Sequence, residues 1–422
     1  MRQSRTERLI AAPIAGAVLA CALLAAAPAS AQTQPPSAAT ARAWCFNKVA
    51  APQRIGGCTY VLGMKKLTEK QRSGALLNRG AMYLESEDND RAIADLSEAI
   101  KYKSSRQMAL VNRGEAYRRK GDFDAAVADF DKAVALNPKD AIAHFNRGIA
   151  HSDRGEHYEA IADYNVAIGI NPSDAWYFNN RGNSYTDTGN KYRAMADYNY
   201  ALQLDPKFAL AYYNRGNAYR DRDDLDRALA DYNNSIKFDP KYAAAYGNRA
   251  RVFRDRGEID RALADFDQSL RLAPTESRDY YSRGNVYLDR KDYPRALGDF
   301  TAAIKSDEKY AAALNARCVV LTILSRAQEA LADCDQSLKW RPNDAYTLDS
   351  RATAHLKLGD FDAAITDFDA ALKANPKLAS SLYGRGLAKR KKGDGDAAQA
   401  DIDAATAINA DVAKDYAPYG VE

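Results

Sequence analysis

The stretch YYNRGNAYRDR, residues 212–222, has the spacing of a helix that buries one side. Tyr212, Gly216 and Tyr219 recur at intervals of three or four residues, so they are predicted to share the buried face. Arg215 lies within that face, although burying an unpaired cation is costly. The pattern therefore predicts a packed helix whose arginine has a partner.

The same pattern recurs every 34 residues along the chain. A small residue stands at each position equivalent to Gly216: Gly80, Gly114, Gly148, Gly182, Ala250, Gly284, Cys318, Ala352 and Gly386. An arginine precedes each of them: Arg79, Arg113, Arg147, Arg181, Arg215, Arg249, Arg283, Arg317, Arg351 and Arg385. With Ser73 opening the first repeat, ten repeats fill residues 73–412.

Most repeats also end in a proline, which closes a second helix. A fixed period of two amphipathic helices with small residues at their crossing is typical of a solenoid. The segment YYNRGNAYRDRDDLDRALADYNNSIKFDP resembles the tetratricopeptide repeat, and the resemblance covers about four fifths of the chain. It implies an all-α, right-handed superhelical solenoid of antiparallel helix pairs. Glu308 and Ala410 depart from the pattern, because they stand where proline is expected.

An aspartate follows every repeat arginine after sixteen residues: Asp95, Asp129, Asp163, Asp197, Asp231, Asp265, Asp299, Asp333, Asp367 and Asp401. A hairpin folded about its midpoint brings Arg215 level with Asp231, and Arg181 level with Asp197. Because a guanidinium can bind a carboxylate through two hydrogen bonds, we expect structural ion pairs within or between repeats. The alternative is an arginine ladder for a polyanion, which the matched aspartates would neutralise.

The first 31 residues differ from the rest. Arg2, Arg5 and Arg8 precede the apolar run LIAAPIAGAVLACALLAAAPASA. This pattern predicts a signal peptide over 1–31 that is cleaved before Gln32, followed by a linker over 32–41. A lipoprotein anchored at Cys21 is the alternative. We expect a periplasmic or secreted protein with no integral membrane segment in the mature chain.

If the protein is exported, the remaining four cysteines are expected to form disulfides, because disulfides persist in oxidising compartments. Cys45 and Cys58 flank a turn, which predicts a disulfide-stapled helical N-terminal cap over 42–72. Cys318 takes a small position and Cys334 an aromatic position that approach across the helix crossing, which predicts a second disulfide. Buried free thiols are the alternative to this second bridge. A metal site is disfavoured because no histidine lies at ligand spacing.

Nothing in the chain suggests catalysis. Basic and acidic residues number 60 and 56, which gives no basic stripe for nucleic acid. His151 and His355 take aromatic core positions, and His144 and His157 are single substitutions. Phosphate-binding loops, nucleophile elbows and zinc spacings are lacking. We expect no enzyme, no cofactor and no metal, and a C-terminal tail over 413–422.

The residue before each repeat arginine forms a ladder of amides: Asn78, Asn112, Asn146, Asn180, Asn214 and Asn248, followed by Ser282, Ala316, Ser350 and Gly384. It resembles the asparagine ladder of the O-linked N-acetylglucosamine transferase repeat domain, which implies binding of a peptide backbone. One amide both donates and accepts, as a peptide group does. The bland alternative is local capping of the backbone. The carboxylate clamp of chaperone-type repeats is lacking, with Asn179, Tyr213 and Gly247 where its lysine is expected.

A second ladder consists of acids late in the first helices: Asp153, Asp187, Asp221, Asp255 and Asp289. Where the two ladders overlap, we expect a preference for extended segments carrying Lys or Arg. Alternatively, these acids are merely solvated beside Arg154, Arg222, Arg256 and Arg290.

Two functions fit this pattern. The first is a non-enzymatic scaffold in the cell envelope that binds an extended peptide or partner protein in the concave groove. The second is a structural assembly factor of an envelope multiprotein complex. Carbohydrate binding by groove tyrosines is a third. The partner, the pathway and the oligomeric state do not follow from the sequence.

Overall fold

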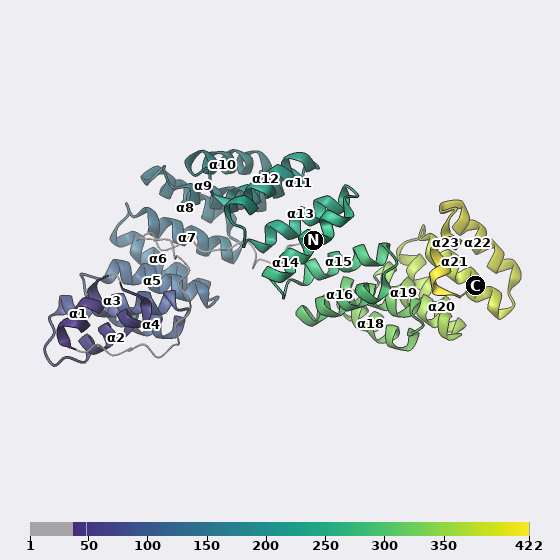
Figure 1. Ribbon diagram of the computed structural model, residues 1–422, viewed down its shortest axis with the longest axis horizontal. Coiled ribbons are helices and arrows are strands. Elements are labelled where there is room, and N and C mark those ends of the chain that lie inside the picture. Colours follow the sequence, from purple (N-terminus) through teal and green to yellow (C-terminus); the bar gives the residue numbers. More distant parts are fainter. Residues whose placement is uncertain (1–36, 48, 422) are drawn as a thin grey trace. The chain divides into compact units, whose positions relative to one another are not determined.

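The computed structural model describes residues 37–47 and 49–421 (Figure 1). All regular structure in these ranges is helical. The expected signal peptide, its cleavage site before Gln32 and the alternative anchor Cys21 lie outside the described residues. Among the residues described, no helix is long and apolar enough to cross a bilayer.

Two short helices precede the repeats: α1 (Ala38–Phe46) and α2 (Ala51–Leu62). The first helices of the ten repeats are α3 (Glu69–Glu85), α5 (Arg106–Arg119), α7 (Ala141–Arg154), α9 (Ala175–Asp187), α11 (Ala209–Arg220), α13 (Ala243–Asp255), α15 (Ser277–Asp289), α17 (Ala311–Ile323), α19 (Ala345–Leu358) and α21 (Ala379–Lys392). The second helices are α4 (Asn89–Ala99), α6 (Phe123–Leu136), α8 (His157–Ile170), α10 (Lys191–Leu204), α12 (Leu225–Phe238), α14 (Ile259–Leu272), α16 (Tyr293–Ser306), α18 (Ala327–Trp340), α20 (Phe361–Ala374) and α22 (Gly395–Ile408). The short helices α23 (Val412–Tyr416) and η2 (Ala417–Tyr419) follow.

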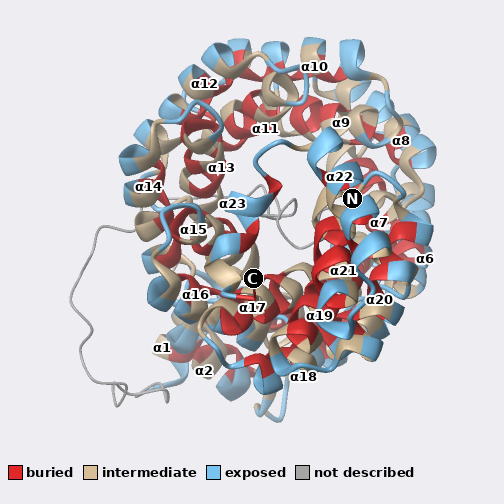
Figure 2. Cartoon of the chain, turned by 90° about the vertical axis from the view of Figure 1, so that its right-hand side faces the viewer, coloured by how far each residue is buried: buried red, intermediate tan, exposed pale blue. Residues whose placement is uncertain are grey.

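The chain divides into two compact bodies, an N-terminal body over Met1–Asp223 and a C-terminal body over Asp224–Glu422. The division falls in the turn between α11 and α12, inside repeat five. Within each body, a first helix packs on its own second helix, and that second helix packs on the next first helix. The buried residues therefore face neighbouring helices, while the exposed ones form the outer surfaces (Figure 2).

Helix α1 begins at Ala38, inside the range 32–41 predicted to be a linker. Ser37 caps this helix, since its hydroxyl accepts a hydrogen bond from the Thr40 amide at 3.1 Å. A side-chain acceptor at the N-cap satisfies an amide that has no partner within the helix. The first four alanine-rich positions of α1 thus extend the cap region toward the N-terminus.

The turns that close the repeats do not depend on proline. Asp307 precedes Glu308, and its side chain accepts a hydrogen bond from the Lys309 amide at 3.0 Å. Asn409 precedes Ala410 and accepts from the Asp411 amide at 3.0 Å. Such side-chain turns end a helix without a proline. Glu308 and Ala410 therefore leave the helix boundaries unchanged, whereas repeat one, with Ser104 at the proline position, ends its second helix earlier, at Ala99.

The small position of each repeat lies where its two helices cross. A Cβ atom built on Gly182 would lie 2.7 Å from the ring of Tyr198 on α10. Any larger residue would push the helices apart, because packed interiors leave no room for an added methyl group. Cys318 occupies the same position in repeat eight, and its sulfur faces Cys334.

The structure contains both cysteine bridges. Cys45 of α1 and Cys58 of α2 form one disulfide, and their Cα atoms lie 4.5 Å apart. Cys318 of α17 and Cys334 of α18 form the other, with Cα atoms 5.7 Å apart. All four side chains are fully buried. Each bridge therefore joins the two helices of one hairpin inside the core.

Candidate functional site

Arg181 is held between the second helices of two successive repeats. Arg181 donates from Nε and Nη2 to the two carboxylate oxygens of Asp197, at 2.8 and 2.7 Å. Its Nη1 donates to Asn165 Oδ1 at 2.6 Å, on the second helix of the preceding repeat. The arginine thus ties its own hairpin together and also ties that hairpin to the one before it.

The clamp on the aspartate sixteen residues later recurs for Arg79, Arg113, Arg147, Arg249, Arg283, Arg317, Arg351 and Arg385. Arg215 also reaches back, since its Nη1 donates to Asn199 Oδ1 at 2.7 Å. Asp231 belongs to the C-terminal body and Arg215 to the N-terminal body, so that pair stays a prediction.

The pKa shifts of these ion pairs support a structural role for the repeat arginines. Burial raises the pKa of Asp197, although Arg181 favours its charged form. Arg147 donates hydrogen bonds to Asp163 and Asp131, and these bonds raise the pKa of Arg147 although burial lowers it. Removing one member of such a half-buried pair would strand the other in a site that water reaches poorly. These guanidinium groups are therefore occupied by the protein itself.

We call the residue before each repeat arginine the ladder position, and the surface that these positions share the ladder face. Asn112, Asn146 and Asn180 are partly exposed there, as is Asn78. Within the described part of the chain, the side chains of Asn112 and Asn146 form no hydrogen bond. Asn180 donates to the Trp176 carbonyl at 2.9 Å, one turn earlier in α9. Repeats two to four therefore present three partly accessible amides in succession.

Like Asn180, the other three asparagines of the ladder form hydrogen bonds within the protein. Asn78 is half-buried and donates to the Cys45 carbonyl of α1 at 3.0 Å. Asn214 is buried, and its Nδ2 donates to Asn179 Oδ1 at 2.9 Å. Asn248 is also buried and accepts from Arg251 Nη1 at 2.6 Å. The ladder is thus uniform in sequence but not in accessibility.

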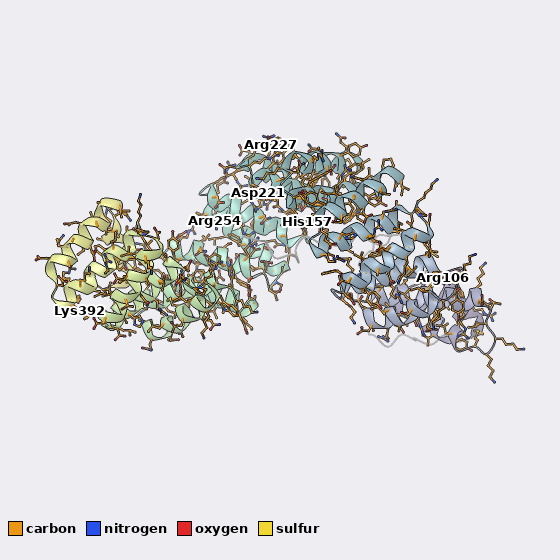
Figure 3. All side chains as sticks on the ribbon, turned by 180° about the vertical axis from the view of Figure 1, so that it is seen from behind. Arg106, His157, Asp221, Arg227, Arg254 and Lys392 are labelled. Atoms are coloured by element: carbon orange, nitrogen blue, oxygen red, sulfur yellow. A yellow bond between two sulfur atoms is a disulfide. The ribbon has the colours of Figure 1, made fainter. Side chains whose placement is uncertain are left out.

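The acidic ladder also divides into two parts. Asp153 is buried and pairs with Arg118 Nη1 at 2.8 Å. The other four acids, Asp187, Asp221, Asp255 and Asp289, are exposed at the ends of the first helices. Figure 3 labels Asp221 among the side chains of this surface. Asp221 and Asp255 also pair with the arginine that precedes each of them, Arg220 at 3.2 Å and Arg254 at 2.7 Å.

The arginines that follow the acids of this ladder contact residues of the preceding repeat. Arg154 pairs with Asp124 at 2.9 Å, Arg256 with Asp226 at 2.5 Å, and Arg290 with Asp260 at 2.6 Å. Each of these pairs joins the end of a first helix to the start of the preceding second helix. Arg222 instead donates to the Lys191 carbonyl at 3.0 Å. These arginines therefore tie successive repeats together.

A buried charge cluster was not predicted. Arg118 donates to Glu115 at 2.7 Å as well as to Asp153, and Arg119 donates to Glu115 at 2.7 Å. Burial alone would raise the pKa of Glu115, but Arg118 and Arg119 hold it below its usual range. Asp279 forms a second buried site, where it accepts from Ser269 and Arg251. A sequence signal existed for Asp279, because neighbouring repeats have alanine at its position.

The described residues contain no group of three or more His, Cys, Asp or Glu side chains that could hold a metal ion. His144 lies 3.3 Å from Asp163 through Nδ1 and 3.1 Å from the Pro138 carbonyl through Nε2. His157, labelled in Figure 3, lies 3.9 Å from Asp187. These contacts fit histidines that stabilise the local packing.

Tetratricopeptide repeat family models match residues 77–141, 111–175, 281–345 and 350–413. Further models of the same repeat match 182–221, 209–242 and 243–273. No curated protein matches the chain.

Several solved structures are similar. YrrB, described as a repeat protein with an unusual peptide-binding site, is 24% identical over 44% of this chain and 97% of its own, with a TM-score of 0.38. A tetratricopeptide repeat protein from Parabacteroides merdae is 22% identical over 60% and 99%, with a TM-score of 0.48. A chain of the APC/C hetero-tetramer Cut9–Hcn1 is 16% identical over 88% and 87%, with a TM-score of 0.48.

Proposed function

The chain belongs to the tetratricopeptide repeat family, and on that premise we propose that it is a non-catalytic scaffold that binds an extended peptide or partner protein on its ladder face. Repeat arrays use extended surfaces of this kind for binding. The repeat arginines and aspartates are internally paired, so the binding groups are to be sought among the remaining polar positions of the first helices.

The observation that carries this proposal is the run of partly exposed amides at Asn112, Asn146 and Asn180. They occupy the same position in three consecutive first helices. A side-chain amide can donate to a carbonyl and accept from an N–H group of one peptide bond. Such contacts read the backbone of a bound segment rather than its side chains. The proposed ligand is therefore an extended peptide with limited sequence requirements.

The exposed acids give the ladder face a preference for positively charged segments. Asp187 and Asp221 lie at the ends of α9 and α11 in the N-terminal body, close in sequence to the amides of repeats four and five. A carboxylate that is open to solvent attracts a cationic side chain, and the attraction weakens as salt increases. We therefore assign the ladder face a preference for segments that contain Lys or Arg.

The proposed location is the cell envelope or the exterior. The two buried disulfides support an oxidising compartment, because reducing compartments keep most thiols free. The expected signal peptide supports the same assignment from the sequence.

A second candidate function is assembly into a multiprotein complex through the second helices. Five large apolar side chains are exposed on α8 and α10: Tyr158, Val166, Ile170, Tyr192 and Tyr200. Tyr158 is 74% and Tyr192 is 85% exposed, and the two lie one repeat apart. Exposed apolar surfaces of this kind often mark protein contacts. A stable partner lost on Tyr158→Ser and Tyr192→Ser substitution would favour this role.

Capture from an envelope extract tests the main proposal. The wild-type chain and an Asn112→Ala, Asn146→Ala, Asn180→Ala variant are immobilised, and the bound proteins are identified by mass spectrometry. Gln203→Ala, an exposed amide on α10, is the matched control. We expect the partners of the wild type to bind the control and not the ladder variant. Equal capture by all three proteins would contradict binding through the ladder.

A further inference from the structure

The segment after α22 turns back onto the first helices instead of ending the array. α23 packs on α21, and η2 lies against α17 of repeat eight. Figure 1 shows this last segment in yellow beside α21. Its side chains Val412, Tyr416 and Val421 belong to one apolar cluster with residues of α19 and α21. Ten residues thus cross three repeats of the C-terminal body.

Tyr416 is the main anchor of this segment. Its side chain is 2% exposed, and its hydroxyl lies 3.0 Å from Thr353 Oγ1 on α19. Its ring packs against Tyr383, with centroids 5.2 Å apart. A Cβ atom on Gly384 would collide with the Tyr416 hydroxyl and with the Phe368 ring. The glycine at this ladder position therefore makes the space that Tyr416 fills.

The chain changes direction directly after this anchor. Pro418 lies in η2, where its missing N–H group cannot continue a helix. Gly420 has a φ of +59°, a left-handed conformation that glycine adopts without strain. Lys357 of α19 donates to the Tyr419 carbonyl. These features hold the Tyr-Ala-Pro-Tyr-Gly stretch against the ladder face.

The covered region coincides with the end of the amide ladder. Repeats one to six carry asparagine at the ladder position, whereas Ala316, Ser350 and Gly384 occupy it in repeats eight to ten. Small residues leave room for a second chain to approach the helices. The two halves of the ladder face are thus built for different contacts.

We propose that the ladder face of repeats eight to ten is a second binding site, specific for a short segment of the pattern Tyr-x-Pro-Tyr-Gly, and that residues 416–420 are its releasable resident ligand. This goes beyond the proposed function, because the amide ladder is not part of the site. A partner carrying such a segment competes with the chain's own copy for the Tyr416 space.

The packing of the last segment on α19 and α21 has the features of a reversible contact. α23 spans five residues, and helices this short are not stable by themselves. Asp411, Lys414 and Asp415 are exposed, so only a few side chains hold the segment. Segments with few buried contacts open at a small fraction of the global unfolding free energy. The covalent link keeps the local concentration high, so release needs a competing ligand.

A labelled peptide with the sequence of residues 410–422, ADVAKDYAPYGVE, tests the proposal in trans. The full-length Tyr416→Ala variant, whose own segment lacks the anchor, should bind this peptide at least tenfold more tightly than the wild type does. Adding Gly384→Asn to that variant should abolish binding. Tyr346→Ala, an exposed tyrosine of α19, is the control and should behave as the wild type. Equal binding by Tyr416→Ala and wild type would overturn the proposal.

Hydrogen exchange of the unmodified chain gives a second measurement that does not depend on the folding of a variant. The hydrogen-bonded amides of Ala417 and Gly420 should exchange at least tenfold faster than those of α21, and faster still with the free peptide present. Protection equal to that of α21 would show a permanent cap and overturn the proposal. Because the probe is the chain's own segment, neither result depends on whether the amide ladder binds a partner.

Discussion

Arg181 holds the Asp197 carboxylate through two parallel hydrogen bonds, of 2.8 Å from Nε and 2.7 Å from Nη2. The third nitrogen of the same guanidinium contacts Asn165 in the preceding repeat. One side chain therefore stabilises both a hairpin and its stacking on the next. This arrangement explains why a cation recurs inside an otherwise apolar helix face.

Breaking this clamp should destabilise the array. We expect Arg181→Ala and Asp197→Ala each to lower the free energy of unfolding by about 3 kcal/mol, because each leaves a half-buried charge without its partner. The double variant should lose less than the sum of the two. Urea unfolding measures these differences. Arg227→Ala removes an exposed pair with Asp224 and is the control.

Small and additive losses would contradict the clamp. They would mean that water replaces the carboxylate without cost, as it does for exposed ion pairs.

The disulfides should form in the exported protein. Mass spectrometry without reductant should show bridged peptides that contain Cys45–Cys58 and Cys318–Cys334. Closing the loop between Cys318 and Cys334 should contribute about 3 kcal/mol, since it restricts the unfolded chain. A Cys318→Ser, Cys334→Ser variant should therefore unfold at lower urea concentration. Reduced cysteines in the mature protein would contradict both the bridges and the proposed compartment.

Asp349 should make the C-terminal body more stable as the pH falls. Burial raises the pKa of Asp349 to about 6, although Ser380 and Ser381 donate hydrogen bonds to it. The folded chain then binds more protons than the unfolded chain between the ordinary pKa of an aspartate and pH 6. Stability from this group is present at low pH and is lost as the pH rises through about 6.

Thermal unfolding of Asp349→Asn measures this effect. The variant should be more stable than the wild type at pH 7.5, and the difference should shrink at pH 5. Asp396→Asn, an exposed acid of α22, should show no such dependence. A difference that is the same at both pH values would show that Asp349 does not titrate in this range.

The ion pairs could be predicted from the sequence because the fixed 34-residue repeat places residues sixteen apart side by side on the two helices of a hairpin. The accessibility of the amides could not. Asn214 and Asn180 have the same repeat position, yet Asn214 is buried against Asn179 of the preceding repeat. Its environment depends on a neighbour 35 residues earlier that does not follow the repeat pattern. Repeat periodicity therefore predicts the position of a side chain but not its partners.

The return of the last segment could not be predicted for a similar reason. Pro418 and Gly420 indicate a turn, but they do not say where the chain goes next. The direction of the last segment depends on the space beside Gly384. In the sequence, Gly384 marks only the end of the amide ladder. The turn signal at Pro418 and Gly420 and the small residue at Gly384 predict the return of the segment only when the structure shows that they lie together.

Nuclear magnetic resonance tests directly whether the amides of repeats two to four bind a peptide backbone. The chain is labelled with ¹⁵N at asparagine and titrated with the tightest-binding member of a library of peptides containing Lys and Arg. The side-chain amide signals of Asn112, Asn146 and Asn180 should shift. Those of Asn214 and Asn248 serve as internal controls, because both are buried and bonded within the protein.

The variants give the corresponding affinities for the same peptide. Each Asn→Ala change should weaken binding about fivefold, as expected for one lost hydrogen bond of about 1 kcal/mol. We expect the signals of all three partly exposed amides to shift, together with this loss of affinity. Peptide binding that leaves all three signals unmoved would contradict backbone binding by the ladder.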